Sequence, residues 1–223
     1  MSNISKEVVI IEAVRTPIGT YKGSLKNIKA HQLGSVVIKE VLKRSNLASE
    51  EVDEIIIGQV LTAGTGQNPA RQAAMEAGIP VSKPSHIVNQ VCGSGLRAVI
   101  SGLQSIKLGE SSKVITGGQE NMSIAPNLIF NKNLKKNFED ELVDSMVYDG
   151  LLDAFNNYHM GVTAENVAKK FNISRIDQDI FALNSQKKTE TAINTNRFEE
   201  ELIKINQSGI YLDLDEHPRK KLT

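Results

Sequence analysis

The single cysteine of this sequence is the residue best placed to do chemistry. Cys92 lies within NQVCGSGLRAV (residues 89–99), between an apolar run and a string of small residues. The run HIVNQV predicts a buried strand, and the pattern from Gly95 to about Leu108 predicts a helix. The thiol is therefore expected at a strand-to-helix turn, where Gly93 and Gly95 permit a tight backbone and leave space for a ligand. A helix N-terminus at this point favours a thiolate.

The local pattern leaves two interpretations of Cys92 open. The dipole of a helix is worth about 0.3–1 kcal/mol, whereas one pKa unit corresponds to about 1.4 kcal/mol. A helix start alone therefore does not ionise a thiol at neutral pH, and a nucleophilic cysteine needs a base or a cationic partner as well. The flanking glycines resemble a nucleophile turn. The alternative is an inert cysteine in the core, because free cysteine is among the most buried residue types.

The other chemistry-bearing residues do not suggest a second site. His31, His86 and His217 lack the spacing of a metal-binding pair, and one cysteine adds no ligand cluster, so we expect no metal. The paired glycines at 117–118 are not followed by a GK[ST] or GxGxxG pattern, which argues against a phosphate loop. The acidic segment DLDEH (213–217) is expected to be a solvated turn.

The composition argues against several classes of function. The 223 residues include 26 basic and 26 acidic side chains, and this balance gives no electrostatic reason to bind nucleic acid or an anionic membrane. Aromatic residues make up 4% of the chain and Trp is absent, which argues against base-stacking platforms. One cysteine excludes an internal disulfide, no window approaches the roughly 20 apolar residues of a membrane span, and Glu7 comes too early for a signal peptide. We therefore expect a soluble, cytoplasmic protein.

Strand-like and helical patterns alternate along the first half of the chain. Short β-branched runs predict strands, and apolar residues at helical spacing predict helices. In chain order, the predicted elements are a strand at 8–14, a helix at 30–44, a strand at 54–61, a helix at 69–78, a strand at 86–91, a helix at 95–108 and a strand at 113–118. Such alternation is typical of an α/β layered fold with largely parallel strands.

The character of the sequence changes after Gly118. Residues 120–160 show little periodicity, and an irregular insertion of that length is usually functional or an assembly element. A helix expected to begin near Ser174 carries Asp177 three positions later, a variant of the capping box. The elements predicted in this half are helices at 162–171 and 174–196 and a strand at 200–205. We therefore divide the chain into an α/β unit at 1–119 and a second unit at 120–223.

Five segments of the sequence resemble the thiolases, acyltransferases that join or cleave 3-ketoacyl-CoA thioesters. NQVCGSGLRAV resembles the active-site segment of that family. The other four segments are VRTPIGTYKGSL (14–25), GQVLTAGTGQNPARQAA (58–74), GGQENMSIAP (117–126) and YHMGVTAEN (158–166). All five occur in the family's order. The last resembles the loop-domain motif of the biosynthetic branch, the acetyl-CoA C-acetyltransferases, and the resemblance extends over essentially the whole chain.

This resemblance implies a fold, a reaction and a set of partners. The fold would be a layered α/β/α unit with an inserted loop domain, which corresponds to the N-terminal half of a thiolase. The reaction would convert two acetyl-CoA into acetoacetyl-CoA and free CoA, reversibly, through an acyl-cysteine at Cys92. Coenzyme A thioesters would be substrates, with no separate cofactor. The complete protein would be a homo-oligomer, a dimer or a tetramer, with no nucleic-acid or membrane partner.

The same resemblance assigns roles to individual residues. Cys92 would become acylated, and its backbone N–H would contribute to an oxyanion hole at the helix start. His159 and Met160 would lie beside the pantetheine and thioester portion of CoA, and Leu151 is a further candidate for that pocket. Arg219 would approach the nucleotide end of CoA. Core packing is the alternative for Met160, and a solvated surface charge is the alternative for Arg219.

The sequence also departs from the family pattern. Thiolases are longer and consist of two similar halves, and these 223 residues contain no NEA-type asparagine segment, GHP-type histidine or CxGGG-type cysteine. In the family, those segments supply an oxyanion donor, the activator of the nucleophile and the acid/base thiol. We therefore expect the C-terminal half to be absent, the isolated chain to be inactive, and apolar surface and a sheet edge to be exposed. The alternatives are a non-catalytic acyl-CoA-binding or dimerising fragment, and a related Claisen-type synthase, which fits Cys92 but not the HMG and GGxEN motifs together.

Overall fold

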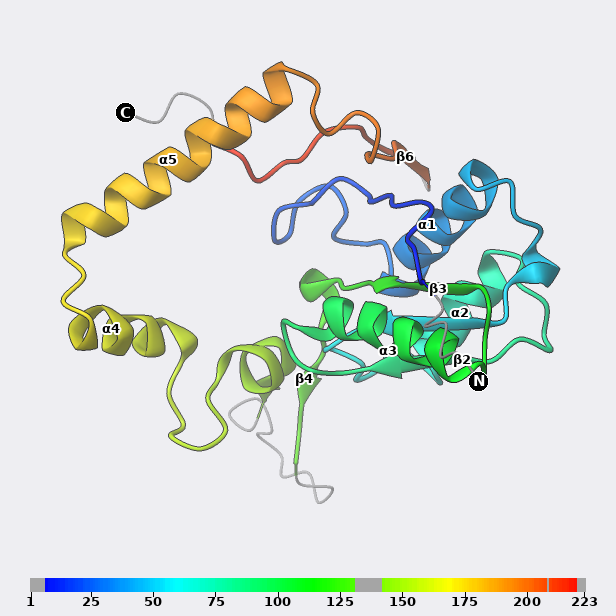
Figure 1. Cartoon of the computed structure of the whole chain (residues 1–223). Coiled ribbons are helices and arrows are strands. Elements are labelled where there is room, and N and C mark those ends of the chain that lie inside the picture. The colour runs from blue at the N-terminus through cyan, green and yellow to red at the C-terminus, as the bar shows by residue number, and fades with distance from the viewer. Residues whose placement is uncertain (1–6, 131–141, 208, 220–223) are drawn as a thin grey trace, which may run out of the picture.

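Three short parallel strands form the centre of the molecule. The computed structural model describes residues 7–130, 142–207 and 209–219 (Figure 1). β1 (Glu54–Gly58) lies in the middle of the sheet, and both β2 (Ser85–Val88) and β3 (Val114–Gly118) pair with it in parallel. The carboxyl ends of all three strands therefore lie at one edge of the sheet.

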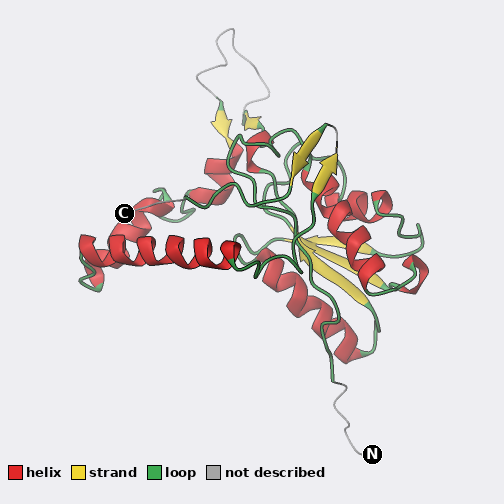
Figure 2. Cartoon of the chain, turned by 90° about the horizontal axis from the view of Figure 1, so that it is seen from above, coloured by secondary structure: helices red, strands yellow, loops and turns green. Residues whose placement is uncertain are grey.

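Helices cover both faces of this sheet, as the two views in Figures 1 and 2 show. α1 (Ala30–Arg44) and α2 (Pro69–Glu76) pack together on one face, where Ile55 and Ile57 of β1 join them in a buried apolar cluster. α3 (Ser94–Leu108) packs against β1 and β3 on the other face. The predicted α/β layered fold is confirmed.

Local signals in the sequence set the helix boundaries. α1 occupies the predicted range, and its helical spacing buries Leu33, Ile38 and Leu42. α2 begins where Asn68 Oδ1 accepts a hydrogen bond from the Arg71 N–H at 3.1 Å, with proline at the first helical position. Because capping bonds and helical periodicity are local, these boundaries could be predicted to within a residue or two.

The second half of the described chain contains smaller and more scattered elements. Its helices α4 (Met160–Lys170) and α5 (Arg175–Asn194) extend away from the three-stranded sheet in Figure 1. The predicted capping box of α5 is confirmed, since the Asp177 N–H donates to Ser174 Oγ at 3.1 Å and the Ser174 N–H donates to Asp177 Oδ2 at 3.2 Å. The short elements among the described residues are η1 (Ser49–Glu51), η2 (Met122–Ile124), β4 (Asn127–Leu128), β5 (Val143–Asp144), the π-helical turn η4 (Met146–Leu151), β6 (Ile205–Gln207) and β7 (Ile210–Leu212). Part of the irregular stretch expected at 120–160, residues 131–141, lies outside the described residues.

The end of the described chain returns to the α/β unit. β6 and β7 form an antiparallel hairpin, and buried Ile205 joins Leu25, Ile28 and Leu33 in a second apolar cluster at α1. Arg15 links the end of the described chain to the α/β unit. Its guanidinium forms ion pairs with Glu201 at 2.6 Å and with Asp215 at 2.7 Å.

The strand predicted at 8–14 is wrong. Residues 8–14 are extended but belong to no strand, and Val9, Ile10 and Ile11 are 66%, 76% and 70% exposed. The only pairing next to this run is an isolated bridge between Arg15 and Leu202 within the described part of the chain. A run of β-branched residues predicts a strand only where a partner offers its N–H and C=O groups, and the described residues supply none here. The exposed apolar surface that we expected is present at this run.

The strand predicted at 200–205 is also misplaced. Only Ile205 of that range is in β6, and Leu202 forms just the isolated bridge with Arg15. The register with β7 pairs Ile205 with Leu212 and fixes where β6 begins. The strand boundary is set by its partner, which the apolar pattern of 200–205 does not reveal.

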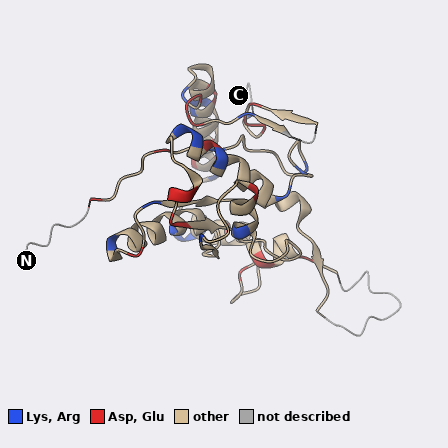
Figure 3. Ribbon diagram, turned by 90° about the vertical axis from the view of Figure 1, so that its right-hand side faces the viewer, with Lys and Arg blue, Asp and Glu red and all other residues tan. Residues whose placement is uncertain are grey.

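Basic and acidic residues are mixed along the described chain. Figure 3 shows Lys and Arg interspersed with Asp and Glu along the ribbon, in line with the balanced composition. No helix among the described residues combines the length and the apolar character that a bilayer crossing requires.

Candidate active site

The carboxyl ends of the three parallel strands are each followed by an amide side chain. Gln59 follows β1, Asn89 follows β2 and Gln119 follows β3. Gln59 and Gln119 are buried, and Gln119 Nε2 donates a hydrogen bond to Gln59 Oε1 at 2.8 Å. In open α/β sheets, ligands bind at this edge, because the loops that leave the strands surround a common crevice. The edge therefore offers hydrogen-bonding groups that carry no charge.

Cys92 lies at the same edge, in the turn between β2 and α3. Its side chain is exposed. The preceding residue, Val91, has a φ of 50°, a left-handed conformation that is a genuine outlier for a β-branched residue. Ser94 Oγ braces the turn, since it accepts from the Gln90 N–H at 2.8 Å and donates to the Val91 carbonyl at 2.6 Å. Strained backbone of this kind clusters at functional sites.

The 15-residue helix α3 starts immediately after the cysteine turn. Its N-cap residue is Gly93, which has no side chain to cap the first N–H groups. The start of a helix carries a partial positive charge and backbone donors that point outward. A thiolate at Cys92, or an oxyanion beside it, is therefore stabilised by this geometry.

Cys92 lines a pocket of about 470 Å³. The apolar side chains around it are Val60, Leu61, Val91, Met122, Met146 and Leu151. Met146 and Leu151 belong to the π-helical turn η4, a rare element that often occurs at functional sites. Among the described residues that line the pocket, Cys92 and Glu120 are the only acidic or basic side chains. The thiol thus opens onto a largely apolar space.

A close approach of two backbones shapes this pocket. A Cβ on Gly58, the last residue of β1, would lie 2.4 Å from the carbonyl carbon of Ser94 in the first turn of α3. Real Cβ atoms do not come so close to backbone, so this contact requires glycine. Gly58 therefore allows the start of α3, and with it the cysteine turn, to lie against the end of the central strand.

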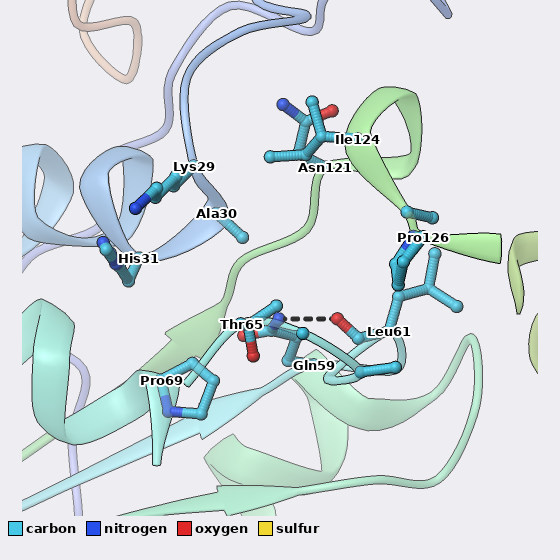
Figure 4. Close-up of a pocket in the computed structure, with 13 residues that line it drawn as sticks. Lys29, Ala30, His31, Gln59, Leu61, Thr65, Pro69, Asn121, Ile124 and Pro126 are labelled. Carbon is cyan, nitrogen blue, oxygen red and sulfur yellow. Dashed lines mark hydrogen bonds between the residues drawn. The ribbon is translucent and has the colours of Figure 1, made fainter. Parts of the chain in front are cut away.

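Gln59 and Leu61 line both the Cys92 pocket and a smaller cavity of about 140 Å³, which Figure 4 shows. Gln59 Nε2 donates to the Leu61 carbonyl at 2.9 Å, the dashed bond of Figure 4. On the far side of this cavity, His31 Nδ1 lies 3.2 Å from Gln72 Oε1, and burial lowers the pKa of His31. Cys92 does not line the smaller cavity.

Glu120 adds a carboxyl group to the wall of the Cys92 pocket. Its Oε2 accepts hydrogen bonds from the backbone N–H groups of Val60 at 2.8 Å and Leu61 at 3.3 Å. Burial raises the pKa of Glu120, and these N–H groups offset part of that shift by stabilising the carboxylate. The sequence pattern gave Glu120 no role.

Comparison with known proteins identifies the family to which this arrangement belongs. The family profile described as "Thiolase, N-terminal domain" matches residues 8–223. The chain belongs to the thiolase family. The probable acetyl-CoA acetyltransferase of Escherichia coli (strain K12) is 48% identical over 219 residues, which cover 96% of this chain and 56% of that protein. The cytosolic acetyl-CoA acetyltransferase of Rattus norvegicus is 50% identical over 219 residues, which cover 96% and 55% of the two chains.

A solved thiolase structure has the same fold. The Acat5 thiolase of Ascaris suum in complex with coenzyme A matches with a TM-score of 0.88 and 36% sequence identity, over 94% of this chain and 54% of that one. The predicted resemblance to the thiolases and the fold of their N-terminal half are therefore confirmed. This thiolase chain spans just over half the length of the relatives that it matches.

The structure brings together some of the residues to which the thiolase resemblance assigns roles. Leu151 lines the same pocket as Cys92. His159 is the N-cap residue of α4, where its Nδ1 accepts from the Gly161 N–H at 3.0 Å, and an isolated bridge joins it to Leu152. His159 is therefore one residue removed from the pocket wall but does not line the pocket.

Met160 and Arg219 lie outside the Cys92 pocket. Met160 is the first residue of α4 and is 39% exposed. It is therefore not packed in the core, which was the alternative to a role in CoA binding. The exposed residue Arg219 lies against α5, where its backbone N–H donates to Gln186 Oε1 at 2.9 Å. The functional roles of both residues remain predictions.

The sequence pattern did not indicate the polar residues that support the cysteine turn. Asn89 Oδ1 accepts from the Val91 N–H at 2.9 Å, and Glu120 holds the Val60 and Leu61 N–H groups. A usable signal was present, because polar residues directly after parallel strands lie at the ligand-binding edge. Among the described residues, no three His, Cys, Asp or Glu side chains gather as a metal site.

Proposed function

We propose that Cys92 accepts the acetyl group in an acetyl-CoA C-acetyltransferase reaction of the thiolase type. The complete reaction converts two acetyl-CoA into acetoacetyl-CoA and CoA. The observation that carries this proposal is the exposed thiol at the start of an uncapped helix, beside a largely apolar pocket. The acetyl-CoA acetyltransferases named above, which match nearly the whole of this chain, support the choice of reaction.

The first half-reaction transfers the acetyl group to the enzyme. The sulfur of Cys92 attacks the thioester carbonyl carbon, the bond from that carbon to the CoA sulfur breaks, and the proton from the thiol ends on the CoA sulfur. The carbonyl oxygen becomes an oxyanion during attack, and backbone N–H groups at the start of α3 are placed to stabilise it. The acetyl methyl group enters the apolar part of the pocket.

We further propose that the second half of the described chain binds coenzyme A. Leu151 supports this because it lines the Cys92 pocket, and His159 and Met160 follow it at the start of α4. These three residues would contact the pantetheine and thioester portion, and Arg219 would approach the nucleotide end. Coenzyme A is named as the ligand of the Ascaris suum thiolase, and no separate cofactor is invoked.

The second half-reaction needs groups beyond those described. A second acetyl-CoA must lose a proton from its methyl group before it attacks the acetyl-cysteine. The 223 residues contain no second cysteine to carry that proton. We therefore expect the chain by itself to be inactive in the complete reaction and to stop at acetyl-Cys92.

An acyl-CoA-binding or dimerising role without catalysis is the second candidate. The exposed apolar residues Val9, Ile10 and Ile11 favour it, because a patch of this kind is usually covered by another surface. The complete thiolase is proposed to be a homo-oligomer, a dimer or tetramer, and to be cytoplasmic, as the name of the rat relative states for that protein. Sedimentation of the chain at several concentrations tests the association.

The decisive test is transfer of the acetyl group from acetyl-CoA, followed by intact-protein mass spectrometry and peptide mapping. The wild-type chain is expected to gain one acetyl group at Cys92, and Cys92→Ser is expected to gain none. The matched control moves the thiol to the opposite edge of the sheet by combining Cys92→Ser with Ser112→Cys, since Ser112 is exposed. This control is expected to remain unacetylated.

Two outcomes contradict the catalytic proposal. Equal acetylation of the relocated thiol would show that any exposed cysteine reacts. Binding of acetyl-CoA to a folded wild-type chain that never acetylates Cys92 would instead favour the non-catalytic role.

A further inference from the structure

A chain of hydrogen bonds connects Glu120 to the residue before the cysteine. Glu120 Oε2 accepts from the Val60 N–H at 2.8 Å. The Val60 carbonyl accepts from Asn89 Nδ2 at 3.5 Å, and Asn89 Oδ1 accepts from the Val91 N–H at 2.9 Å. The chain thus runs from the end of β3, across the end of β1, to the turn that follows β2.

The last residue in this chain needs support. Val91 has a φ of 50°, which brings its Cβ close to the following carbonyl oxygen. Such a conformation persists only where the surroundings hold it. The bond from the Val91 N–H to Asn89 and the bond from Ser94 Oγ to the Val91 carbonyl hold it from two sides. A change at either bond alters the direction in which Cys92 presents its sulfur.

The environment of Glu120 is unfavourable for a merely structural carboxylate. Its Oε1 is buried and has no hydrogen-bond partner among the described residues, and burial raises the pKa of the group. At the opposite edge of the same strands, Asp53 Oδ2 also accepts from two successive backbone N–H groups, those of Ser112 and Lys113. Asp53 is only half-buried, so this type of link does not require burial, and hydrogen bonds lower the pKa of Asp53. The burial of Glu120 therefore indicates a role in the pocket.

We propose that Glu120 is a positioning residue that fixes the Cys92 turn through Val60 and Asn89. This proposal rests on acyl transfer at Cys92 as the function of the site. Glu120 holds the N–H groups of residues 60–61, Val60 in turn fixes Asn89, and Asn89 keeps Val91 in its left-handed conformation. The thiol is thereby held in one direction relative to the N–H groups at the start of α3.

Substitutions at both ends of the hydrogen-bond chain test this role. Glu120→Ala removes the acceptor, whereas Glu120→Gln keeps an oxygen that can accept from the same N–H groups. Amide hydrogen exchange is measured at Val60, Leu61 and Val91 by NMR, and acetylation of Cys92 by acetyl-CoA is measured in the same samples. Glu120→Ala is expected to speed exchange at all three amides and to slow acetylation at least about tenfold, because small misplacements of a reacting group have large effects on rate. Glu120→Gln is expected to keep most of the wild-type protection from amide exchange and most of the wild-type acetylation rate.

Asp53→Ala is the matched control, because Asp53 makes the same kind of link at the opposite edge of the sheet. It is expected to speed exchange at Ser112 and Lys113. Exchange at Val91 and acetylation of Cys92 should stay within about twofold of wild type, since distant sites act independently. A general loss of stability would instead speed exchange at the Val91 amide in both Glu120→Ala and Asp53→Ala.

Asn89→Ala keeps the proposal testable if Glu120→Ala does not fold. Asn89 is exposed, so its truncation leaves the core intact. It is expected to speed exchange at Val91 and slow acetylation, while Val60 and Leu61 remain bonded to Glu120.

The outcomes separate this inference from the proposed function. Wild-type acetylation of Cys92 with unchanged rates in Glu120→Ala and Asn89→Ala overturns the positioning role alone. If wild-type Cys92 is never acetylated, the proposed function fails, and exchange at Val91 then decides whether Glu120 fixes the turn. An unchanged rate of exchange at the Val91 amide in Glu120→Ala overturns the inference in that case too.

Discussion

The two edges of the parallel sheet use the same hydrogen-bond motif in opposite environments. At the amino edge, Asp53 accepts from the N–H groups of Ser112 and Lys113, and these bonds lower its pKa. At the carboxyl edge, Glu120 accepts from the N–H groups of residues 60–61, and burial raises its pKa. Both carboxyl groups link the loops of β1 and β3. Only the second does so in the wall of a pocket.

The residues around each motif differ in the same way. The amino edge adds an exposed ion pair, Lys113 with Glu51 at 2.5 Å, which is open to solvent and contributes little. The carboxyl edge has no such ion pair among the described residues; beside Glu120 it has the buried amides of Gln59 and Gln119 and a glycine at position 58. The ion-pair side chains at the amino edge are exposed to solvent, whereas the carboxyl edge buries polar groups, and Gln119 Oε1 and Glu120 Oε1 there have no hydrogen-bond partner among the described residues. Buried polar atoms without a partner are rare in folded proteins. The difference marks the carboxyl edge as the functional one.

Among the substitutions that test this contrast, Gly58→Ala should have the largest effect on stability and on acetylation of Cys92. The new Cβ would lie 2.4 Å from the Ser94 carbonyl carbon, so α3 must move or β1 must bend. We expect the free energy of unfolding to fall by about 3 kcal/mol, as for strong overpacking, and acetylation of Cys92 to be lost. Urea denaturation and mass spectrometry measure the two effects.

The control for Gly58→Ala is Gly117→Ala in the neighbouring strand. A Cβ at Gly117 meets no atom within 4 Å, so we expect a change below about 1 kcal/mol. Comparable losses in the two variants would show that the contact between Gly58 and Ser94 is not the critical one.

The opposite pKa shifts predict opposite pH dependences at the two edges. Because the pKa of Asp53 is lowered on folding, its contribution is present above the ordinary value of 3.8 and is lost as the pH falls. Asp53→Asn should therefore lower the free energy of unfolding at neutral pH by about 1 kcal/mol, and the difference should shrink in acid. Urea denaturation across the acidic and neutral range measures this trend.

Glu120→Gln should show the reverse trend. Because the pKa of Glu120 is raised on folding, its favourable contribution is present below the ordinary value of 4.5 and is lost as the pH rises through the folded pKa. Glutamine does not titrate, so the stability of the variant relative to wild type should increase as the pH rises. The same direction of change at both edges would contradict the contrast between them.

Val91→Asn should give the smallest effect. Asparagine adopts the left-handed conformation more readily than valine, and Val91 is 48% exposed, so the new amide is not buried. We expect the free energy of unfolding to rise by about 1 kcal/mol. Val81→Asn, at a 79% exposed valine whose φ is not positive, is the matched control and should not gain stability. A loss of stability in Val91→Asn would show that φ at this position is not strained.

Much of the fold could be predicted because its signals are local. The helix at 30–44 has the predicted bounds, and α5 begins at the predicted Ser174 cap. The run at 8–14 has an equally clear β-branched pattern and forms no strand, because strand formation depends on a partner that the pattern does not contain. The division of the chain at 119/120 stays a prediction.

The candidate site likewise has one part that could be predicted from the sequence and one part that could not. The turn at Cys92 could be predicted, because an apolar run, glycine and a helical pattern are adjacent in the sequence. The link from Glu120 through Val60 and Asn89 could not, since these residues are separated by 29 positions or more and meet only at the ends of neighbouring strands. Their side chains are ordinary polar residues until the sheet register is known.

The sequence by itself determined the alternation of strands and helices, the capped helix starts, the thiol at a strand-to-helix turn and the resemblance to the thiolases. Each depends on residues that are neighbours in the chain or on motifs read along it. Only the tertiary structure decided that Val9, Ile10 and Ile11 stay exposed, that Glu120 is buried in the pocket wall and that Val91 is held left-handed. The first depends on whether a partner strand lies beside the run, and the other two depend on the parallel register of three strands, which brings residues distant in sequence together at one edge.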